Sequence, residues 1–167
     1  MSYDLIVKPT FNLQDEHWMR LALEQASFAA SQGEIPVGAV IVSQDKVIGV
    51  GYNAPITLND PTAHAEVMAL RDACANLGNY RLPHDATLYV TLEPCTMCVG
   101  ALVHARVQKV IFAASEPKSG SLLSARQLLN NNGYYNHIFE YQSGCLQDEA
   151  AAVLSAFFKM RRAQKKQ

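Results

Sequence analysis

The chain has 167 residues, 49% of them hydrophobic, and this predicts one domain with enough apolar side chains to bury a core. Its 14 basic and 15 acidic residues nearly cancel, so overall charge gives no reason to expect a polyanionic partner. The first ten residues contain Asp4 and Pro9 and no long apolar run, so we expect neither a secretory signal nor a membrane span there.

The N-terminal half predicts helices around a β-hairpin. Residues 1–12 are expected to be irregular, and Asn12 is a suitable N-cap for the helix that follows, with Gly33 as its stop. Small apolar residues lie on one face of that helix, and two β-branched segments follow it. The predicted elements are a helix over 15–32, hairpin strands over 37–42 and 47–52, a loop over 53–61, and a helix from 61 or 62 to about 77.

The C-terminal half predicts alternating strands and helices. The order strand, helix, strand is typical of parallel strands with a right-handed crossover. We therefore expect a single α/β domain over 1–167, a three-layer α/β/α sandwich with helices on both faces of one mixed central sheet. The predicted elements are strands over 86–91, 109–114 and 138–141, helices over 95–104, 124–129 and 146–164, and a loop over 116–120.

The last helix is expected to be apolar on one side and basic at its end. Its apolar stripe consists of Leu146, Ala150, Val153, Phe157 and Met160. The tail over 159–167 holds several basic residues, among them Lys159, Arg161 and Arg162, and no acidic residue. Such a tail can contact RNA, although basic residues also close many helices because they suit the negative end of the helix dipole.

The most informative residues are His64, Glu66, Cys95 and Cys98. They form the pattern His-x-Glu followed by Pro-Cys-x-x-Cys. One imidazole and two thiolates supply three zinc ligands and leave the fourth tetrahedral position open, as in catalytic sites. The carboxylate of Glu66 then remains available to carry protons. This combination is the established signature of zinc-dependent nucleobase deaminases.

The spacing of Cys95 and Cys98 alone allows two other interpretations. A Cys-x-x-Cys pair can belong to a structural zinc site or to a redox centre. A structural site needs a fourth protein ligand, and neither Cys74 nor Cys145 has a Cys-x-x-Cys partner. A redox pair is expected near the first strand of a βαβ unit, whereas this pair lies past the middle of the chain and follows Pro94.

Two helix N-termini are expected at the metal. His64 and Glu66 are predicted in the first turn of one helix, although residues two apart diverge by about 200° on a regular helix. Cys95 and Cys98 lie one turn apart on the same helix face, so both can reach one ion. The positive end of that helix favours thiolate over thiol. The implied reaction is hydrolytic replacement of an exocyclic amino group by a carbonyl, with Glu66 as the proton carrier.

The flanking residues narrow the substrate class. Over about residues 16–162 the chain closely resembles the bacterial tRNA-specific adenosine deaminase family, within the cytidine and deoxycytidylate deaminase superfamily. The segments that carry the resemblance are EIPVGAV at 34–40, DPTAHAE at 60–66, NYRL at 79–82, DATLYVTLEPC at 85–95 and FFKMRR at 157–162.

The resemblance implies a cytidine deaminase-like fold and conversion of adenosine to inosine at the wobble position of a tRNA anticodon, chiefly of an arginine tRNA, in a cytoplasmic homodimer. It implies one zinc ion per subunit and a flipped base in the pocket. The implied contacts with the nucleoside are made by Asn53, Val37, Leu92 and the N–H of Ala65, and with the adjacent RNA by Glu116, where related sequences commonly carry aspartate.

Two rival functions remain. A deaminase of a free base or nucleotide, such as guanine, cytosine or dCMP, uses the same metal chemistry. Such an enzyme has no use for a basic helix end beside its pocket, whereas an enzyme acting on RNA gains salt-dependent affinity from it. The second rival is a non-catalytic subunit or a zinc-stabilised RNA-binding module. The presence of Glu66 favours an active enzyme over such a subunit.

Overall fold

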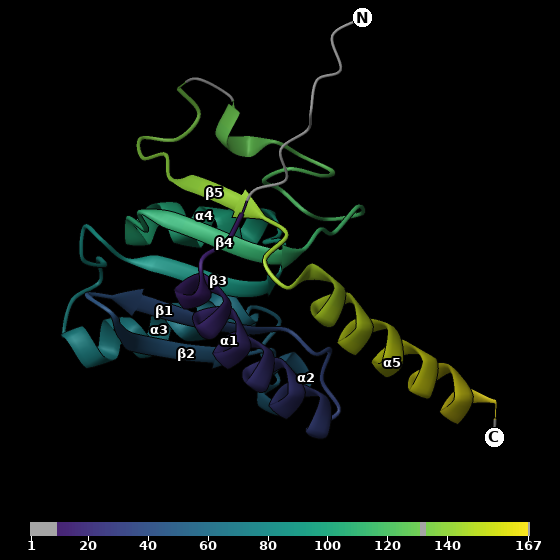
Figure 1. Cartoon of the computed structure of the whole chain (residues 1–167). Coiled ribbons are helices and arrows are strands. Elements are labelled where there is room, and N and C mark those ends of the chain that lie inside the picture. The colour runs from purple at the N-terminus through teal and green to yellow at the C-terminus, as the bar shows by residue number, and fades with distance from the viewer. Residues whose placement is uncertain (1–9, 131–132, 167) are drawn as a thin grey trace, which may run out of the picture.

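A computed structural model describes residues 10–130 and 133–166 (Figure 1). Most of the segment 1–12 that the sequence predicts to be irregular lies outside these residues. No described helix is long and apolar enough to cross a bilayer. The elements are α1 Leu13–Ser31, β1 Gly38–Ser43, β2 Lys46–Tyr52, α2 Pro55–Leu58, α3 Ala65–Leu77, β3 Thr87–Leu92, α4 Thr96–Ala105, β4 Lys109–Ala114, the 3-10 turn Leu128–Asn130, β5 Glu140–Ser143 and α5 Gln147–Lys165.

The central sheet is mixed, as predicted. Its strand order is β2-β1-β3-β4-β5. Strand β1 is antiparallel to both β2 and β3, and β3, β4 and β5 run parallel. The two parallel strands β3 and β4 are joined by α4, which is the strand, helix, strand unit expected from the sequence. Their carboxyl ends therefore lie at one edge of the sheet, where α4 begins.

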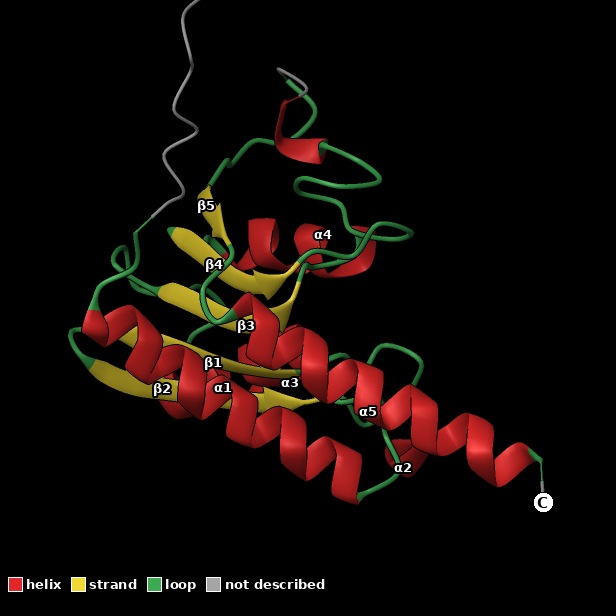
Figure 2. Ribbon diagram, turned by 45° about the vertical axis from the view of Figure 1, so that its right-hand side comes forward, coloured by secondary structure: helices red, strands yellow, loops and turns green. Residues whose placement is uncertain are grey.

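Helices cover both faces of the sheet, which confirms the three-layer sandwich (Figure 2). Helices α1 and α5 pack on one face through residues such as Met19, Ala22 and Ala150. Helices α3 and α4 pack on the other through Ala69, Val103 and their neighbours. The long α5 extends past the sheet, and its C-terminal end projects from the molecule (Figure 1).

Close packing of α3 on β2 determines where the first residues of α3 lie. A Cβ added at Gly51 in β2 would overlap the carbonyl oxygen of Ala65 and the amide nitrogen of Ala69. The strand and the helix backbones are therefore in contact, which only glycine permits at this point. Because Gly51 stands two residues before Asn53, this contact also brings Asn53 beside the N-terminus of α3.

Several predicted elements agree with the structure, and those that differ include a loop, a short helix, the last strand and the last helix. Asn12 caps α1 in a capping box with Asp15, and all four small or apolar residues of the predicted α1 stripe are buried. The loop predicted over 53–61 contains α2, which begins at a proline. The helix predicted over 124–129 is wrong, because only residues 128–130 form a 3-10 turn there.

The other two differences concern the bounds of the last strand and the buried stripe of the last helix. Strand β5 spans Glu140–Ser143, two residues later than predicted, because its pairing with β4 rather than local hydrophobicity determines its bounds. In α5, Ala150 and Phe157 are buried, but Met160 is 45% exposed. The C-terminal part of α5 extends past the sheet and finds little to pack against (Figure 1). Met160 therefore does not belong to the buried stripe.

Candidate active site

A cavity of about 280 Å³ lies at the carboxyl ends of β3 and β4. Segments from across the chain form its wall: the residues before β1, the segment from β2 to α3, the connections after β3 and β4, and α5. The lining residues are Ile35, Val37, Asn53, Pro55, His64, Glu66, Leu92, Glu93, Cys95, Glu116, Ser119, Leu154 and Phe158. Most of the predicted site residues therefore meet in one place.

The three predicted metal ligands converge at the inner end of this cavity. The Nδ1 atom of His64 lies 3.6 Å from the Sγ atom of Cys95 and 3.6 Å from the Sγ atom of Cys98. All three ligand atoms lie within 4.8 Å of one another. One nitrogen and two sulfur atoms at this separation fit a single zinc ion, which prefers these donors in tetrahedral geometry.

The position of His64 corrects one prediction and removes a geometric difficulty. His64 is the N-cap of α3 with extended backbone, at φ −75° and ψ 153°, and is not in the first helical turn. The 200° divergence of two helical residues therefore does not apply to His64 and Glu66. Likewise Cys95 is the N-cap of α4 and Cys98 lies in the first turn. Two helix N-termini meet at the metal ligands, as predicted.

The pair of cysteine thiols readily loses one proton, and the resulting thiolate is shared by hydrogen bonding. Hydrogen bonding from the Cys98 thiol, and then from the His64 ring, lowers the pKa of the Cys95 thiol to about 4. The hydrogen bond to Cys95 and burial in turn raise the pKa of Cys98. The hydrogen bond with Cys95 also raises the pKa of His64. A divalent cation would supply the positive charge that favours deprotonation of both cysteines.

No fourth protein ligand joins this cluster within 10–130 and 133–166. Among these residues, His64, Cys95 and Cys98 form the one group of three or more potential ligands. Cys74 and Cys145 are free cysteines outside it. A three-ligand site with a neighbouring cavity is the arrangement of catalytic zinc, so the geometry disfavours the structural alternative.

Glu66 lies beside the ligands in the cavity wall. It is in the first turn of α3 and is only 4% exposed. Burial raises the pKa of its carboxyl to about 7. A carboxyl group with a pKa near neutrality can both accept and donate a proton, which general acid–base catalysis requires.

Three of the four predicted nucleoside contacts, Val37, Asn53 and Leu92, line the cavity, as does Glu116, whereas Ala65 is buried and does not. Val37 is 4% exposed, and Leu92 is partly buried at the end of β3. The Oδ1 atom of Asn53 accepts a hydrogen bond of 2.9 Å from the N–H of Ala65. This hydrogen bond orients the Asn53 amide, so the Nδ2 group of Asn53 remains available to a molecule in the cavity. Glu116 lies in the connection after β4.

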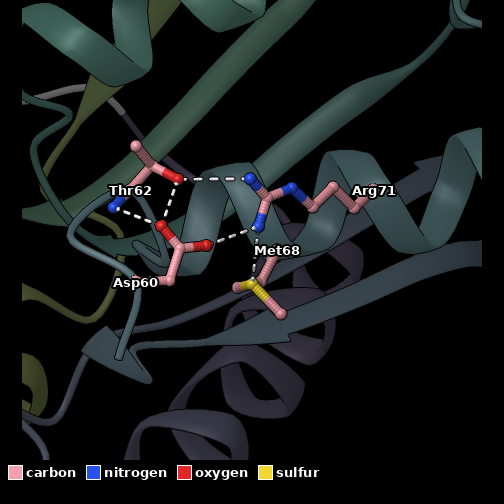
Figure 3. A network of polar contacts seen from close by, with 4 residues as sticks. All are labelled: Asp60, Thr62, Met68 and Arg71. Atoms are coloured by element: carbon pink, nitrogen blue, oxygen red, sulfur yellow. Dashed lines mark hydrogen bonds and ion pairs between the residues drawn. The ribbon is translucent and has the colours of Figure 1, made fainter. Parts of the chain in front are cut away.

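A polar network supports the segment that carries His64 (Figure 3). Asp60 Oδ1 accepts hydrogen bonds from the N–H and the hydroxyl of Thr62, at 2.8 and 2.7 Å. Arg71 of α3 donates to Asp60 Oδ2 and to Thr62 Oγ1, at 3.0 and 3.1 Å, and its guanidinium also contacts Met68. The Thr62 hydrogen bonds, with help from Arg71, lower the pKa of Asp60 to about 2. The turn before His64 is therefore fastened to the second helical turn of α3.

Sequence reasoning missed several residues of the wall. Leu154 and Phe158 on α5 line the cavity, although apolar spacing predicted only a core stripe for this helix. Glu93 is 3% exposed and stands beside the Pro-Cys-x-x-Cys motif. The segment Leu92-Glu93-Pro94 could have indicated the role of Glu93, because a charged residue directly after a buried strand needs buried partners.

The basic tail lies outside the cavity wall. Lys159, Arg161 and Arg162 are exposed on α5, directly after Phe158 of the wall. The Arg161 guanidinium lies 5.8 Å from the centre of the Phe157 ring, in a cation–π contact. These three basic residues therefore lie within about one helical turn of Phe158 in the cavity wall.

Comparisons with known proteins agree with this geometry. Residues 12–114 match the zinc-binding region of cytidine and deoxycytidylate deaminases. The tRNA-specific adenosine deaminase of Haemophilus influenzae is 49% identical over 91% of this chain and 87% of its own length. A structure from work on A-to-I editing by tRNA:A34 deaminases at the wobble position of transfer RNA has a TM-score of 0.79 at 42% identity, covering 83% of this chain and 99% of that chain.

A solved guanine deaminase of Bacillus subtilis is also similar, with a TM-score of 0.57 at 45% identity over 63% of this chain and 66% of that chain. The H. influenzae relative is matched over a much larger share of its length. The chain therefore belongs to the cytidine and deoxycytidylate deaminase family with its zinc-binding region, and within it to the tRNA-specific adenosine deaminases.

Proposed function

We propose that this protein hydrolyses the exocyclic amino group of adenosine at the wobble position of a tRNA anticodon, chiefly of an arginine tRNA, and so forms inosine. The observation that carries this proposal is the open three-ligand site with the buried Glu66 beside it, at the base of a cavity large enough for one nucleoside. The related tRNA-specific adenosine deaminases supply the substrate class.

His64, Cys95 and Cys98 would hold a zinc ion, which would supply Lewis-acid activation of a water molecule as the nucleophile. Glu66 accepts the proton of that water and donates it to N1 of the adenine ring as the C6–O bond forms. The same carboxylate then takes the remaining proton from the new C6 hydroxyl and transfers it to the departing nitrogen. The C6–N bond breaks, ammonia leaves, and the base keeps a carbonyl oxygen at C6. The raised pKa of Glu66 suits both directions of this transfer.

The cavity supports recognition of a single flipped base. Its volume of about 280 Å³ is at the small end of ligand pockets. Val37 and Leu92 supply apolar walls for the base, and the oriented amide of Asn53 donates to the nucleoside. Glu116 faces the neighbouring sugar and backbone. A base inside a helix cannot reach such a site, so the nucleotide enters from a loop.

The basic end of α5 supports an RNA substrate over a free base. Phe158 belongs to the cavity wall, and Lys159, Arg161 and Arg162 follow it on the exposed part of the same helix. Phosphates on either side of a bound nucleotide can therefore reach these side chains. Each neutralised phosphate releases counterions, which makes the affinity fall with salt. A free-base deaminase, the alternative that the guanine deaminase likeness favours, gains nothing from them.

A second copy of the chain fits the outer side of α3 and α4. A groove of about 380 Å³ there is mainly apolar, and it is lined by Val67, Leu70, Arg71, Cys74, Tyr80, Ala101, His104 and Ala105. Tyr80 is 72% exposed. Burial of these side chains would stabilise a homodimer. Ala101→Glu should then yield monomers in light-scattering measurements, whereas an unchanged mass would exclude this face.

The thiolate ligands fit a reducing compartment such as the cytoplasm.

The decisive experiment uses an arginine tRNA anticodon stem-loop with adenosine at the wobble position. Nucleoside analysis after incubation with the zinc-loaded protein should detect inosine, and Glu66→Ala should give none. Free adenine, guanine, cytosine and dCMP serve as competing substrates in parallel reactions. Turnover of one of these with no inosine in the RNA would replace this proposal by the free-base alternative.

A further inference from the structure

Glu93 is a buried carboxylate that the deamination mechanism does not use. It follows β3 and immediately precedes the Pro-Cys-x-x-Cys motif, and it is 3% exposed. Burial of a carboxylate is costly unless it is hydrogen-bonded. Within the described residues no cation pairs with it, because the ion pairs found there join other residues. Its partners are instead backbone and side-chain groups of one loop.

The loop over residues 116–124 donates four hydrogen bonds to this carboxylate. The Oε2 atom of Glu93 accepts from the N–H of Glu116 at 3.3 Å. The Oε1 atom accepts from the N–H groups of Leu123 and Ser124, at 2.9 and 3.0 Å, and from the Ser124 hydroxyl at 3.2 Å. The two ends of the loop are therefore joined through one side chain.

The middle of the loop is held against the metal-binding segment as well. The N–H of Ser121 donates to the carbonyl oxygen of Pro94 at 2.9 Å, and the hydroxyls of Ser121 and Thr96 are 2.8 Å apart. Gly120 packs directly on Glu93, and an added Cβ there would overlap the Oε2 atom. The loop thus lies on residues 93–96, which include the ligand Cys95.

The same loop contributes to the wall of the cavity through Glu116 and Ser119. Because the carboxylate binds residue 116 on one side and residues 123 and 124 on the other, it determines where the intervening residues lie. A backbone N–H is a strong donor, and a carboxylate accepts several at once. The loop carries one glycine and three serines, which by themselves leave the backbone many conformations.

We propose that Glu93 is a positioning residue that fastens loop 116–124 to the zinc-ligand segment and thereby holds Glu116 and Ser119 at the substrate. All the hydrogen bonds that its carboxylate accepts within the described residues come from this loop, so it acts through the loop. The inference that this affects turnover rests on the proposed function, whereas the fastening itself is independent of it.

Glu93→Gln tests the fastening from the side of the carboxylate. The amide replaces one acceptor oxygen with a donor that faces N–H groups, so the loop loses part of its anchoring. Hydrogen–deuterium exchange of residues 116–124 should accelerate by about tenfold or more, while α1 and α3 keep their protection. Zinc content per chain should stay the same. Asp85→Asn is the matched control, because Asp85 binds Ser43 and Gln44 in a similar way outside the cavity wall.

Gly120→Ala tests the same contact from the side of the loop. The added methyl group displaces the loop from Glu93 and should give the same exchange pattern in a chain that keeps Glu93. In a Glu93→Ala background the overlap with the carboxylate is removed and only the close contact with the Glu116 carbonyl oxygen remains, so the further effect of Gly120→Ala should be smaller there. This second variant remains informative if Glu93→Gln does not fold.

Kinetics on the RNA substrate separate positioning from chemistry. Glu93→Gln should raise KM by about tenfold with a smaller change in kcat, since the ligands and Glu66 are untouched. Unchanged loop exchange, or loss of zinc in parallel with loop protection, would overturn the proposal. Faster loop exchange in a protein whose wild type forms no inosine would refute the proposed function and leave the positioning role standing.

Discussion

Asn53 carries two hydrogen-bonding groups, and two substitutions separate helix capping from substrate contact. Its Oδ1 atom accepts from the N–H of Ala65, the first residue of α3. The N-cap residue His64 makes no side-chain capping bond, because its ring faces the two cysteines. Asn53 therefore supplies the capping acceptor of α3 from a neighbouring segment.

The structure indicates the size of the effect. Asn53→Ala removes an acceptor from a part-buried N–H, and the loss of an N-cap acceptor typically lowers the free energy of unfolding by about 1 kcal/mol. In a chain of this size such a loss lowers Tm by about 2–4 °C. Asn53→Asp keeps an oxygen for Ala65 and places negative charge at a helix N-terminus, which is favourable. We therefore expect it to retain most of the stability.

Thermal unfolding and kinetics together test both roles. The melts are compared at one free zinc concentration, because zinc binding to the folded state raises Tm by mass action. Both variants lose the Nδ2 donor, so both should lower kcat/KM by about tenfold. If Asn53→Asp is as unstable as Asn53→Ala at equal zinc content, capping by Asn53 is refuted. If Asn53→Asp keeps full activity, the Nδ2 group has no role in binding.

Three further predictions concern the other polar groups. Glu66→Ala should keep its zinc and lose turnover, measured by metal analysis and inosine formation; loss of zinc would make Glu66 a ligand. Arg161→Ala with Arg162→Ala should weaken RNA binding more at low salt than at high salt, and a salt-independent loss in binding titrations would indicate damaged packing. The pKa of Asp60 is lowered to about 2 from 3.8, so its contribution to stability is present above about pH 4 and is lost as the pH falls toward 2. Asp60→Asn should therefore destabilise the protein at pH 7 and show a smaller difference from wild type near pH 2 in denaturant titrations, whereas a constant difference would contradict this assignment.

The sequence predicted the elements whose signals are local. The buried face of α1, its cap at Asn12 and the exact bounds of β4 follow from residues that are near one another in the chain. The ligands Cys95 and Cys98 also belong to one helical turn. Spacing and residue type are sufficient in these cases, because the interactions that determine them join residues a few positions apart.

The position of His64 was only partly predictable. Its identity as a ligand follows from the motif, but the helix was predicted to begin before it. In the structure the helix begins at Ala65, because Asn53 caps that residue and the turn over 60–63 is held by Arg71. Local propensity cannot include a capping group supplied by a distant segment, so the boundary was wrong by a few residues.

The sequence by itself therefore predicted the cluster of His64, Cys95 and Cys98 and the layered arrangement of strands and helices. Only the tertiary structure decided what surrounds them: Asn53 against Ala65, Glu93 under the loop over 116–124, and α5 along the cavity. Asn53 and Ala65 are 12 positions apart in the chain, and Glu93 and Leu123 are 30 positions apart. Their partners are backbone N–H groups, which every residue except proline carries, so side-chain identity contains no record of which one is bound.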